Sequence, residues 1–157
     1  MEIRFDNQVV LITGASTGIG AAVARAFGQA GARVVVNYNQ SEAAARAVAD
    51  DIQTRGGQAL LVQADVTDLA QIDRLVQASL AQFDRIDVLV NNAGALVQRE
   101  FIADMSDELY RRIMDLNMTS VFQVCRQVIP IMQRQGGGRI INVTSIAARN
   151  GGAGGSA

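Results

Sequence analysis

The sequence contains no histidine, no tryptophan and, among its 14 basic residues, no lysine. Its one cysteine, Cys125, excludes an intrachain disulfide, and without histidine the chain cannot build a cysteine–histidine zinc site. Arginines and acidic residues are interspersed and the formal net charge is −1, so the basic stripe typical of nucleic-acid binders is missing. These absences predict a protein with no metal centre and no nucleic-acid partner.

Long apolar runs are missing as well. Residues 1–8 carry Glu2, Arg4 and Asp6 where a signal peptide has its apolar segment, and no run approaches membrane-spanning length. We therefore expect a cytoplasmic protein with no membrane partner. The 157 residues are 49% hydrophobic and 18% charged, a composition that predicts a single packed domain.

Short β-branched segments alternate with longer segments of helical period, the pattern of an α/β protein with a parallel sheet covered on both faces. Right-handed crossovers then favour a Rossmann-like, doubly wound sheet with strand order 3-2-1-4-5 and helices on both faces. We expect residues 1–149 to form the domain and the glycine-rich residues 150–157 to form a flexible tail. The strands are expected at residues 9–13, 33–37, 59–63, 87–90 and 139–145.

Two helices of this pattern carry specific expectations. A long helix capped by Ser106 is expected to run to the glycines at 136–138, with Leu116 on its core face and with Pro130 kinking it or marking its last turns. The helix after the first strand is expected to bury the face formed by Ile19, Ala22, Val23, Ala26 and Phe27.

A glycine-rich turn, Gly14-Ala15-Ser16-Thr17-Gly18-Ile19-Gly20, lies between the first strand and this helix. Glycines let the backbone turn tightly and approach a diphosphate, whose charge the free N–H groups at the helix start stabilise. The alternative is an ordinary strand–helix loop with helix-packing glycines. Since ligands of open α/β sheets bind at the carboxyl ends of the strands, we expect the binding site at this edge.

Further motifs follow in order along the chain: Asp65, Asn91-Asn92-Ala93-Gly94, Asn117 and Ser145. Together with the G-x-x-x-G-x-G spacing, they resemble the short-chain dehydrogenase/reductase family over the whole chain. Among the branches of that family, the sequence is most similar to bacterial 3-oxoacyl-carrier-protein reductases and glucose dehydrogenases. The resemblance implies an NAD(P)-dependent oxidoreductase that transfers hydride between nicotinamide and a carbonyl or secondary alcohol, with reduction of a 3-oxoacyl thioester as one candidate reaction.

The resemblance also implies a set of cofactor-binding residues. The glycines of the turn would cradle the diphosphate, and Asp65 with Val66 would bracket the adenine. Asn91 would lie beside the cofactor after the fourth strand, and the Asn-Asn-Ala-Gly stretch would tie neighbouring strands together. The alternatives are a helix-capping role for Asp65 and an ordinary polar turn at residues 91–94. The expected cofactor-binding residues at these three places are Gly14, Ser16, Thr17, Gly18, Ile19, Gly20, Asp65, Val66, Asn91, Ala93 and Gly94.

Residues 37–41, after the second strand, bear on the choice between NAD and NADP. An acidic residue there would bind the 2′-hydroxyl of NAD and repel a 2′-phosphate. Its absence favours NADP, with NAD still admissible, and Asn37, Asn39 or Ser41 can donate hydrogen bonds to the phosphate. Against this, Thr17 stands at a position where many similar, NADP-using members of the family carry arginine. No cation here obviously balances the charge of the 2′-phosphate.

By resemblance, Ser145 orients the reacting oxygen and Asn117 holds a water in a proton relay to a catalytic lysine. The alternatives are a turn-forming serine and an asparagine that bonds within its own helix. Family spacing places the catalytic tyrosine just after Ala157 and the lysine one helical turn later; Tyr38 and Tyr110 lie in the wrong elements to substitute. We therefore expect an amino-terminal portion of a longer reductase, lacking the family's last strands and inactive alone; the alternative is a naturally short form.

A second hypothesis is a non-catalytic nucleotide-binding sensor or interaction module. For the enzyme, the resemblance implies a small-molecule carbonyl or alcohol substrate, whose identity the sequence leaves open. It also implies a homo-oligomer, dimer or tetramer, because the long helix of the family usually packs against a second subunit. Cys125, with no histidine to activate it, is expected to be a buried small apolar residue.

Overall fold

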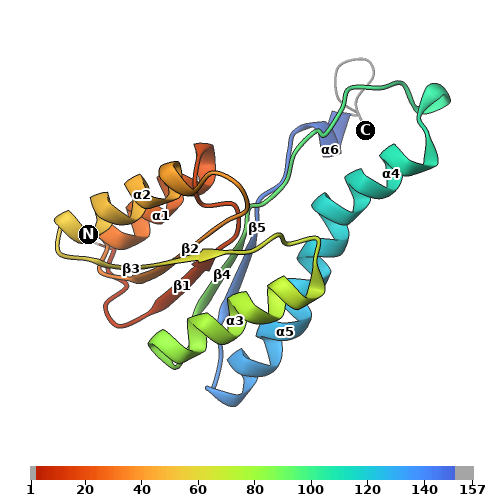
Figure 1. Ribbon diagram of the computed structural model, residues 1–157. Coiled ribbons are helices and arrows are strands. Elements are labelled where there is room, and N and C mark those ends of the chain that lie inside the picture. Colours follow the sequence, from red (N-terminus) through yellow and green to blue (C-terminus); the bar gives the residue numbers. More distant parts are fainter. Residues whose placement is uncertain (1–2, 151–157) are drawn as a thin grey trace.

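The computed structural model describes residues 3–150, and in them one parallel sheet with the strand order β3-β2-β1-β4-β5 (Figure 1). This confirms the predicted order and the doubly wound α/β class. The predicted strand positions are confirmed to within one residue, except that the fifth strand ends earlier than expected. The strands are β1 (Val9–Ile12), β2 (Arg33–Tyr38), β3 (Gln58–Gln63), β4 (Val88–Asn91) and β5 (Arg139–Asn142).

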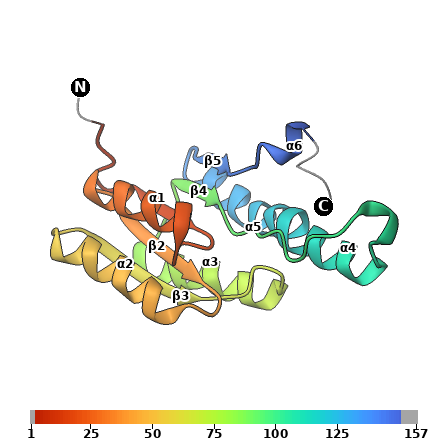
Figure 2. The ribbon, with the colours of Figure 1, turned by 90° about the horizontal axis from the view of Figure 1, so that it is seen from above.

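Helices cover both faces of the sheet, α1 and α2 on one and α3 and α5 on the other (Figures 1 and 2). The alternation of side chains along β1 explains this arrangement, because successive residues of a strand point to opposite faces. Val9 and Leu11 belong to the core under α3 and α5, whereas Val10 and Ile12 belong to the core under α1 and α2. The helices are α1 (Gly18–Gln29), α2 (Glu42–Thr54), α3 (Leu69–Phe83), α4 (Asp107–Met114), α5 (Ser120–Arg134) and α6 (Ala147–Asn150), with a 3-10 turn at Ile102–Asp104.

The expected buried face of α1 is only partly confirmed: Val23 and Phe27 are partly buried and pack against the core, whereas Ile19, Ala22 and Ala26 are exposed. Ile19 is 64% exposed, and the buried residues of the helix are Gly20, Ala21, Ala24 and Gly28. A Cβ added to Gly28 would lie 2.8 Å from the Ile52 side chain of α2, so the two helices approach closely through small residues. Close packing through glycine and alanine does not follow the pattern of large apolar residues on which the expectation depended.

The expected long helix is interrupted. Ser106 caps α4 as predicted, its Oγ accepting from the Leu109 N–H at 3.1 Å, but a five-residue π-helical turn, Asp115–Thr119, separates α4 from α5. Leu116 lies in that turn and is only half-buried. Pro130 lies near the end of α5, as one of the two expectations had it.

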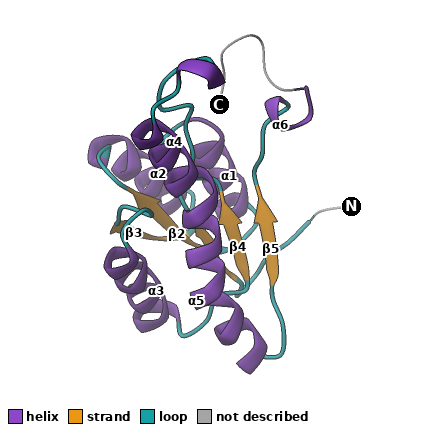
Figure 3. Ribbon diagram, turned by 90° about the vertical axis from the view of Figure 1, so that its right-hand side faces the viewer, coloured by secondary structure: helices purple, strands orange, loops and turns teal. Residues whose placement is uncertain are grey.

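Strand β5 is the edge of the sheet in the described part of the chain, and all four of its residues are exposed (Figure 3). Of the predicted tail at residues 150–157, only Asn150 is described, and it ends α6; the rest lies outside the described residues. Within residues 3–150, no helix combines the length and the apolar character needed to cross a bilayer.

Candidate dinucleotide site

The glycine-rich turn leaves β1 and enters α1 at the carboxyl edge of the sheet. Gly14 and Gly18 adopt the left-handed region, with φ of +61° and +54°. A Cβ on Gly14 would also lie 2.9 Å from the Ala93 Cα, and one on Gly20 would collide with the Asn92 side chain. Nothing lies within 4 Å of a Cβ built on Gly18, so its backbone angle is the reason for glycine there.

The start of α1 presents N–H groups that the helix does not use. Thr17, the N-cap residue, is extended and its side chain makes no capping hydrogen bond. The Ala21 N–H donates to the Thr17 carbonyl at 3.2 Å, and the N–H groups that precede it in the first turn have no carbonyl one turn earlier. With the positive end of the helix dipole, this is an arrangement that accepts a phosphate or carboxylate.

Asn92 and Thr13 fix the turn against the end of β4. The Thr13 Oγ1 accepts from the N–H groups of Asn92 and Ala93, both at 3.0 Å, and Thr13 is 2% exposed. The Asn92 Nδ2 in turn donates to the carbonyls of Thr13 at 3.0 Å and Gly14 at 2.9 Å. Sequence reasoning left Asn92 out of the candidate residues, although its place inside the Asn-Asn-Ala-Gly motif was the available signal.

Asn37 lies inside the fold. It is 1% exposed, and its Nδ2 donates to the carbonyls of Ala64 at 3.0 Å and Val62 at 3.3 Å. Its Oδ1 accepts from the Gly14 N–H at 3.1 Å, and its carbonyl accepts from the Ala15 N–H at 2.7 Å. With both ends of the amide engaged in the interior, the expected direct hydrogen bond from Asn37 to a ribose phosphate is wrong.

Asp65 joins the two loops that follow β2 and β3. Its Oδ1 accepts from the N–H and Oγ1 of Thr67 at 2.8 and 2.7 Å, and its Oδ2 accepts from the Asn39 Nδ2 at 3.1 Å. The alternative helix-capping role belongs instead to Asp68, which accepts from the Ala70 and Gln71 N–H groups at the start of α3. Val66, the other residue expected at the adenine, is 5% exposed.

Other residues near the end of β2 remain exposed. Ser41 occupies the N-cap position of α2, but its side chain makes no capping hydrogen bond. The Arg46 guanidinium, one helical turn further on, is paired with Glu42 at 2.7 Å. Thr17, expected to face this region from the glycine-rich turn, is exposed. Contacts of Ser41 and Thr17 with a cofactor stay predictions.

The side chain of Asn91 is not at the glycine-rich turn. Asn91 is 3% exposed, and its Nδ2 contacts the Asn142 Oδ1 of β5 at 2.9 Å and the Cys125 Sγ of α5 at 3.3 Å. These contacts tie β4 to its neighbours on the α5 side of the sheet. Cys125 itself is partly buried and packs against the core beneath α3 and α5, in agreement with its expected packing role.

Asn117 fastens the loop after β4 to the π-helical turn. Its Oδ1 accepts from the Ala95 N–H at 3.1 Å, and its Nδ2 donates to the carbonyls of Ala95 at 3.0 Å and Ile113 at 2.9 Å. The bond to Ile113 is the local helix bond that was the alternative for this residue. Ser145 is exposed beyond the end of β5, and its Oγ accepts from the Ala147 N–H at 3.2 Å. The catalytic roles of both residues stay predictions.

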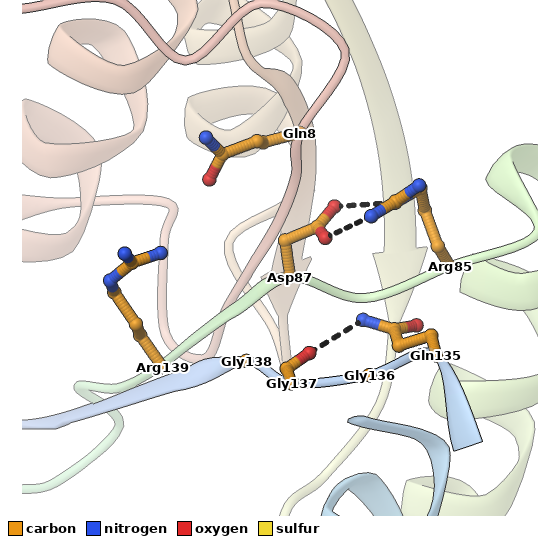
Figure 4. A pocket seen from close by; sticks show the side chains of 8 residues that line it. All are labelled: Gln8, Arg85, Asp87, Gln135, Gly136, Gly137, Gly138 and Arg139. Carbon is orange, nitrogen blue, oxygen red and sulfur yellow. Dashed lines mark hydrogen bonds and ion pairs between the residues drawn. The ribbon is translucent and has the colours of Figure 1, made fainter. Parts of the chain in front are cut away.

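A cavity of about 540 Å³ lies at the opposite, amino end of β1, β4 and β5 (Figure 4). Arg85 holds Asp87 through two hydrogen bonds at 2.8 and 2.6 Å, and the Val9 N–H donates to the same carboxylate at 2.8 Å. Burial by itself raises the pKa of the Asp87 carboxyl, but these hydrogen bonds and the nearby arginine charges hold it below its usual value. Within residues 3–150 no cluster of potential metal ligands gathers there or elsewhere.

The parallel sheet, the glycine-rich turn and the polar residues at the strand ends define a doubly wound α/β protein of the Rossmann type. The family model for short chain dehydrogenases matches residues 8–157, and the chain belongs to this family. The chain is 46% identical over 144 residues to a 3-oxoacyl-[acyl-carrier-protein] reductase of Synechocystis sp., covering 92% of this chain and 58% of the relative. It is 39% identical over 148 residues to the 7alpha-hydroxysteroid dehydrogenase of Escherichia coli K12, covering 94% of this chain and 57% of the relative.

Solved structures agree with these relatives. The fold is similar to that of a 7alpha-hydroxysteroid dehydrogenase complexed with NADH and 7-oxo glycochenodeoxycholic acid, with a TM-score of 0.90 and 38% identity over 95% of this chain and 57% of that one. It is also similar to an NADH-dependent reductase, A1-R', complexed with NAD, with a TM-score of 0.91 and 36% identity over 96% of this chain and 64% of that one. The chain thus spans between half and two thirds of the length of the relatives it matches.

Proposed function

We propose that the chain forms the cofactor-binding part of an NAD(P)-dependent oxidoreductase that transfers hydride between nicotinamide and a carbonyl or secondary alcohol. The observation that carries this proposal is the glycine-rich turn, in which two left-handed glycines lead into a helix start with unpaired N–H groups. Such a helix start stabilises the negative charge of a diphosphate. Relatives described as reductases and dehydrogenases, one complexed with NADH and one with NAD, support it.

In this proposal Gly14, Gly18 and Gly20 shape the diphosphate site, and Ser16, Thr17 and Ile19 line it. Asp65 and Val66 hold the adenine, and Ala93 and Gly94 lie beside the nicotinamide half. Ser145 orients the reacting oxygen. Asn117, in the π-helical turn, holds a water in the proton relay. The carboxyl ends of parallel strands meet at one edge of a sheet, which is why residues from four different loops can serve one cofactor.

NADP is the proposed form of the cofactor, because residues 37–41 contain no carboxylate to repel a 2′-phosphate. With Asn37 engaged inside the fold, Asn39 and Ser41 are the side chains of this segment left to donate to the phosphate. NADPH and NADH are titrated against the folded chain by calorimetry. We expect NADPH to bind more tightly; equal or reversed affinities remove the NADP preference, and the absence of binding by both removes the proposed function.

The proposed catalytic activity differs between the isolated chain and a longer form of the enzyme. Tyr38 is 7% exposed at the end of β2 and Tyr110 lies in α4, so neither accompanies Ser145, and the sequence has no lysine. A tyrosine with a pKa of about 10 needs a neighbouring cation to exchange a proton near neutral pH. We propose that the 157 residues alone bind cofactor without turning over a carbonyl; 3-oxoacyl thioesters are the first substrates to test with any longer form.

A non-catalytic nucleotide-binding module is the second candidate function. This function needs no lysine and no tyrosine beside Ser145, only the glycine-rich turn and the start of α1. The two functions are separated by assaying NADPH oxidation with a longer form of the protein that contains a tyrosine and a lysine after Ala157. Turnover that disappears with Ser145→Ala supports the enzyme, and cofactor binding without turnover supports the module.

Homo-oligomerisation through α4 and α5 is the proposed quaternary interaction. These helices follow each other along one side of the molecule (Figure 3). Together with the π-helical turn between them, they expose large side chains that are normally buried, namely Tyr110 (55%), Met118 (60%), Phe122 (59%) and Ile129 (40%). An apolar surface of this kind marks a protein contact.

A further inference from the structure

We propose that Asn37 is a positioning residue for the dinucleotide, acting through the glycine-rich turn without touching the cofactor. This inference rests on the proposed function. Asn37 is the last residue but one of β2. Its amide reaches both neighbouring strands: it accepts from the Gly14 N–H after β1 and donates to the carbonyls of Val62 in β3 and Ala64 just after it. One side chain therefore fixes three strand ends at the edge where the cofactor would bind.

The burial of Asn37 decides between positioning and direct binding. At 1% exposure, its side chain has no surface to offer a ligand. Its Nδ2 lies 3.0 Å from the Ala64 carbonyl and 3.3 Å from that of Val62, which accounts for both amide protons. Its Oδ1 accepts from Gly14 at 3.1 Å, so the amide has a partner at each end.

The two bonds to the glycine-rich turn divide its N–H groups into two sets. Gly14 donates to the Asn37 side chain and Ala15 donates to the Asn37 carbonyl at 2.7 Å, so these two N–H groups are used within the protein. The N–H groups of Gly18, Ile19 and Gly20 have no partner one turn earlier and remain for an anion. Asn37 thus anchors the beginning of the turn so that its end is presented in one fixed orientation.

Fixing the turn matters because Gly14 has a positive φ of +61° and adjoins Ala93 at close range. A glycine without an anchor visits many backbone conformations, and ordering it on binding costs affinity. The Asn37 side chain removes that freedom before the dinucleotide arrives. Its loss should therefore weaken binding even where the sheet remains folded.

The test compares Asn37→Ala, Asn37→Asp and a control, Val128→Ala, which removes core volume under α5, on the face of the sheet opposite α1. Affinity is measured by calorimetry with NAD. NAD is chosen over NADP because it has no 2′-phosphate, and its diphosphate does not titrate near neutral pH. Asn37→Ala should raise the Kd about tenfold or more, whereas Val128→Ala, despite its loss of stability, should leave the Kd within about twofold. Equal effects of the two variants would overturn the proposal.

Asn37→Asp gives a readout that general destabilisation does not move. A carboxylate facing the Val62 and Ala64 carbonyls is unfavourable, so its pKa is raised, and the protonated form can both donate to Ala64 and accept from Gly14. The Kd of this variant should fall about threefold or more between pH 7.5 and about pH 5.5, while those of the wild-type chain and Asn37→Ala stay flat. A flat profile for Asn37→Asp contradicts the inference.

If the Asn37 variants do not fold, hydrogen exchange of the wild-type chain decides. The Gly14 and Ala15 amides should be protected without nucleotide, and those of Gly18 and Gly20 only after NAD is added. Gly14 exchanging as fast as Gly18 in the free chain overturns the inference. Failure of the wild-type chain to bind NAD at all counts against the proposed function, and normal binding with an unaffected Asn37→Ala counts against Asn37 alone.

Discussion

Gly94 and Asn117 are so close that a Cβ on the glycine would lie 2.8 Å from the asparagine Oδ1. The same Oδ1 accepts from the Ala95 N–H, and the Nδ2 donates to the Ala95 carbonyl. Asn117 can therefore reach the loop only because residue 94 has no side chain. The glycine of the Asn-Asn-Ala-Gly motif and the asparagine of the π-helical turn form one structural unit.

Gly94→Ala should displace the Asn117 side chain and break its pair of bonds to Ala95. We expect the free energy of unfolding in urea to fall by about 1–3 kcal/mol. A double-mutant cycle checks the mechanism, because Gly94→Ala should cost little in an Asn117→Ala background. Additive losses would show that the glycine acts independently of Asn117.

Gly18→Ala should weaken dinucleotide binding, and Gly56→Ala is its matched control. Both glycines have positive φ, +54° and +84°, and neither has an atom within 4 Å of an added Cβ. Each alanine should therefore cost about 1–2 kcal/mol of stability through backbone strain alone. Calorimetric titration should show loss of NADPH affinity for Gly18→Ala and unchanged affinity for Gly56→Ala. Equal affinities of the two variants would remove the turn from the binding site.

Asp87→Asn should destabilise the amino end of the sheet. The carboxylate is held by Arg85 and by the Val9 N–H, and the variant weakens a charge-assisted pair between the buried carboxylate and the half-exposed guanidinium. We expect a loss of about 1–3 kcal/mol at pH 7, measured by urea unfolding. The exposed Asp73→Asn should change stability by less than about 0.5 kcal/mol.

The Asp87 pair also predicts a dependence of stability on pH. The pKa of this carboxyl is lowered in the folded chain from the ordinary value of 3.8. A lowered pKa contributes stability that is fully present above the unfolded pKa and is lost as the pH falls through the folded pKa. The wild-type chain and Asp87→Asn should thus differ most above pH 4 and converge in stronger acid. A difference that persists unchanged in strong acid would contradict this.

Phe122→Glu should disrupt the proposed contact between copies of the chain. Phe122 is 59% exposed on α5, with the Arg126 guanidinium 5.6 Å from its ring centroid. Sedimentation should show a dimer or tetramer for the wild type and a monomer for the variant. Ile102→Glu, which replaces an 83% exposed side chain outside α4 and α5, should leave the assembly intact. A wild-type monomer would remove the proposed interface.

The architecture could be predicted because strands buried on both faces appear in the sequence as short β-branched runs. Helix-capping residues between these runs support the same assignment. Ser106 caps its helix in the predicted place. The buried face of α1 followed only in part. Its closest contact is made by Gly28, which packs against Ile52 because it has no side chain, and hydropathy does not register a contact of that kind. The π-helical turn was also missed, because a single inserted residue leaves the apolar period nearly unchanged.

The candidate site was predictable as a set of motifs and not as a set of contacts. The spacing of the glycines indicated the turn, but whether a polar side chain faces ligand or interior depends on partners far along the chain. Asn37 bonds to Gly14 and Ala64, and Asn92 bonds to Thr13, across separations of more than 20 residues. Hydrogen bonds of that range are properties of the folded sheet, and no local pattern encodes them.

The exposed strand β5 has a practical consequence for handling the isolated chain. Its outer row of peptide groups has no neighbouring strand within residues 3–150, and its isoleucines, Ile140 and Ile141, are 36% and 45% exposed. Such unpaired peptide groups can form hydrogen bonds with an extended segment of another polypeptide, including a second copy of this chain. Solutions of these 157 residues should accordingly cloud on concentration, and nucleotide affinities are best measured where the protein is dilute.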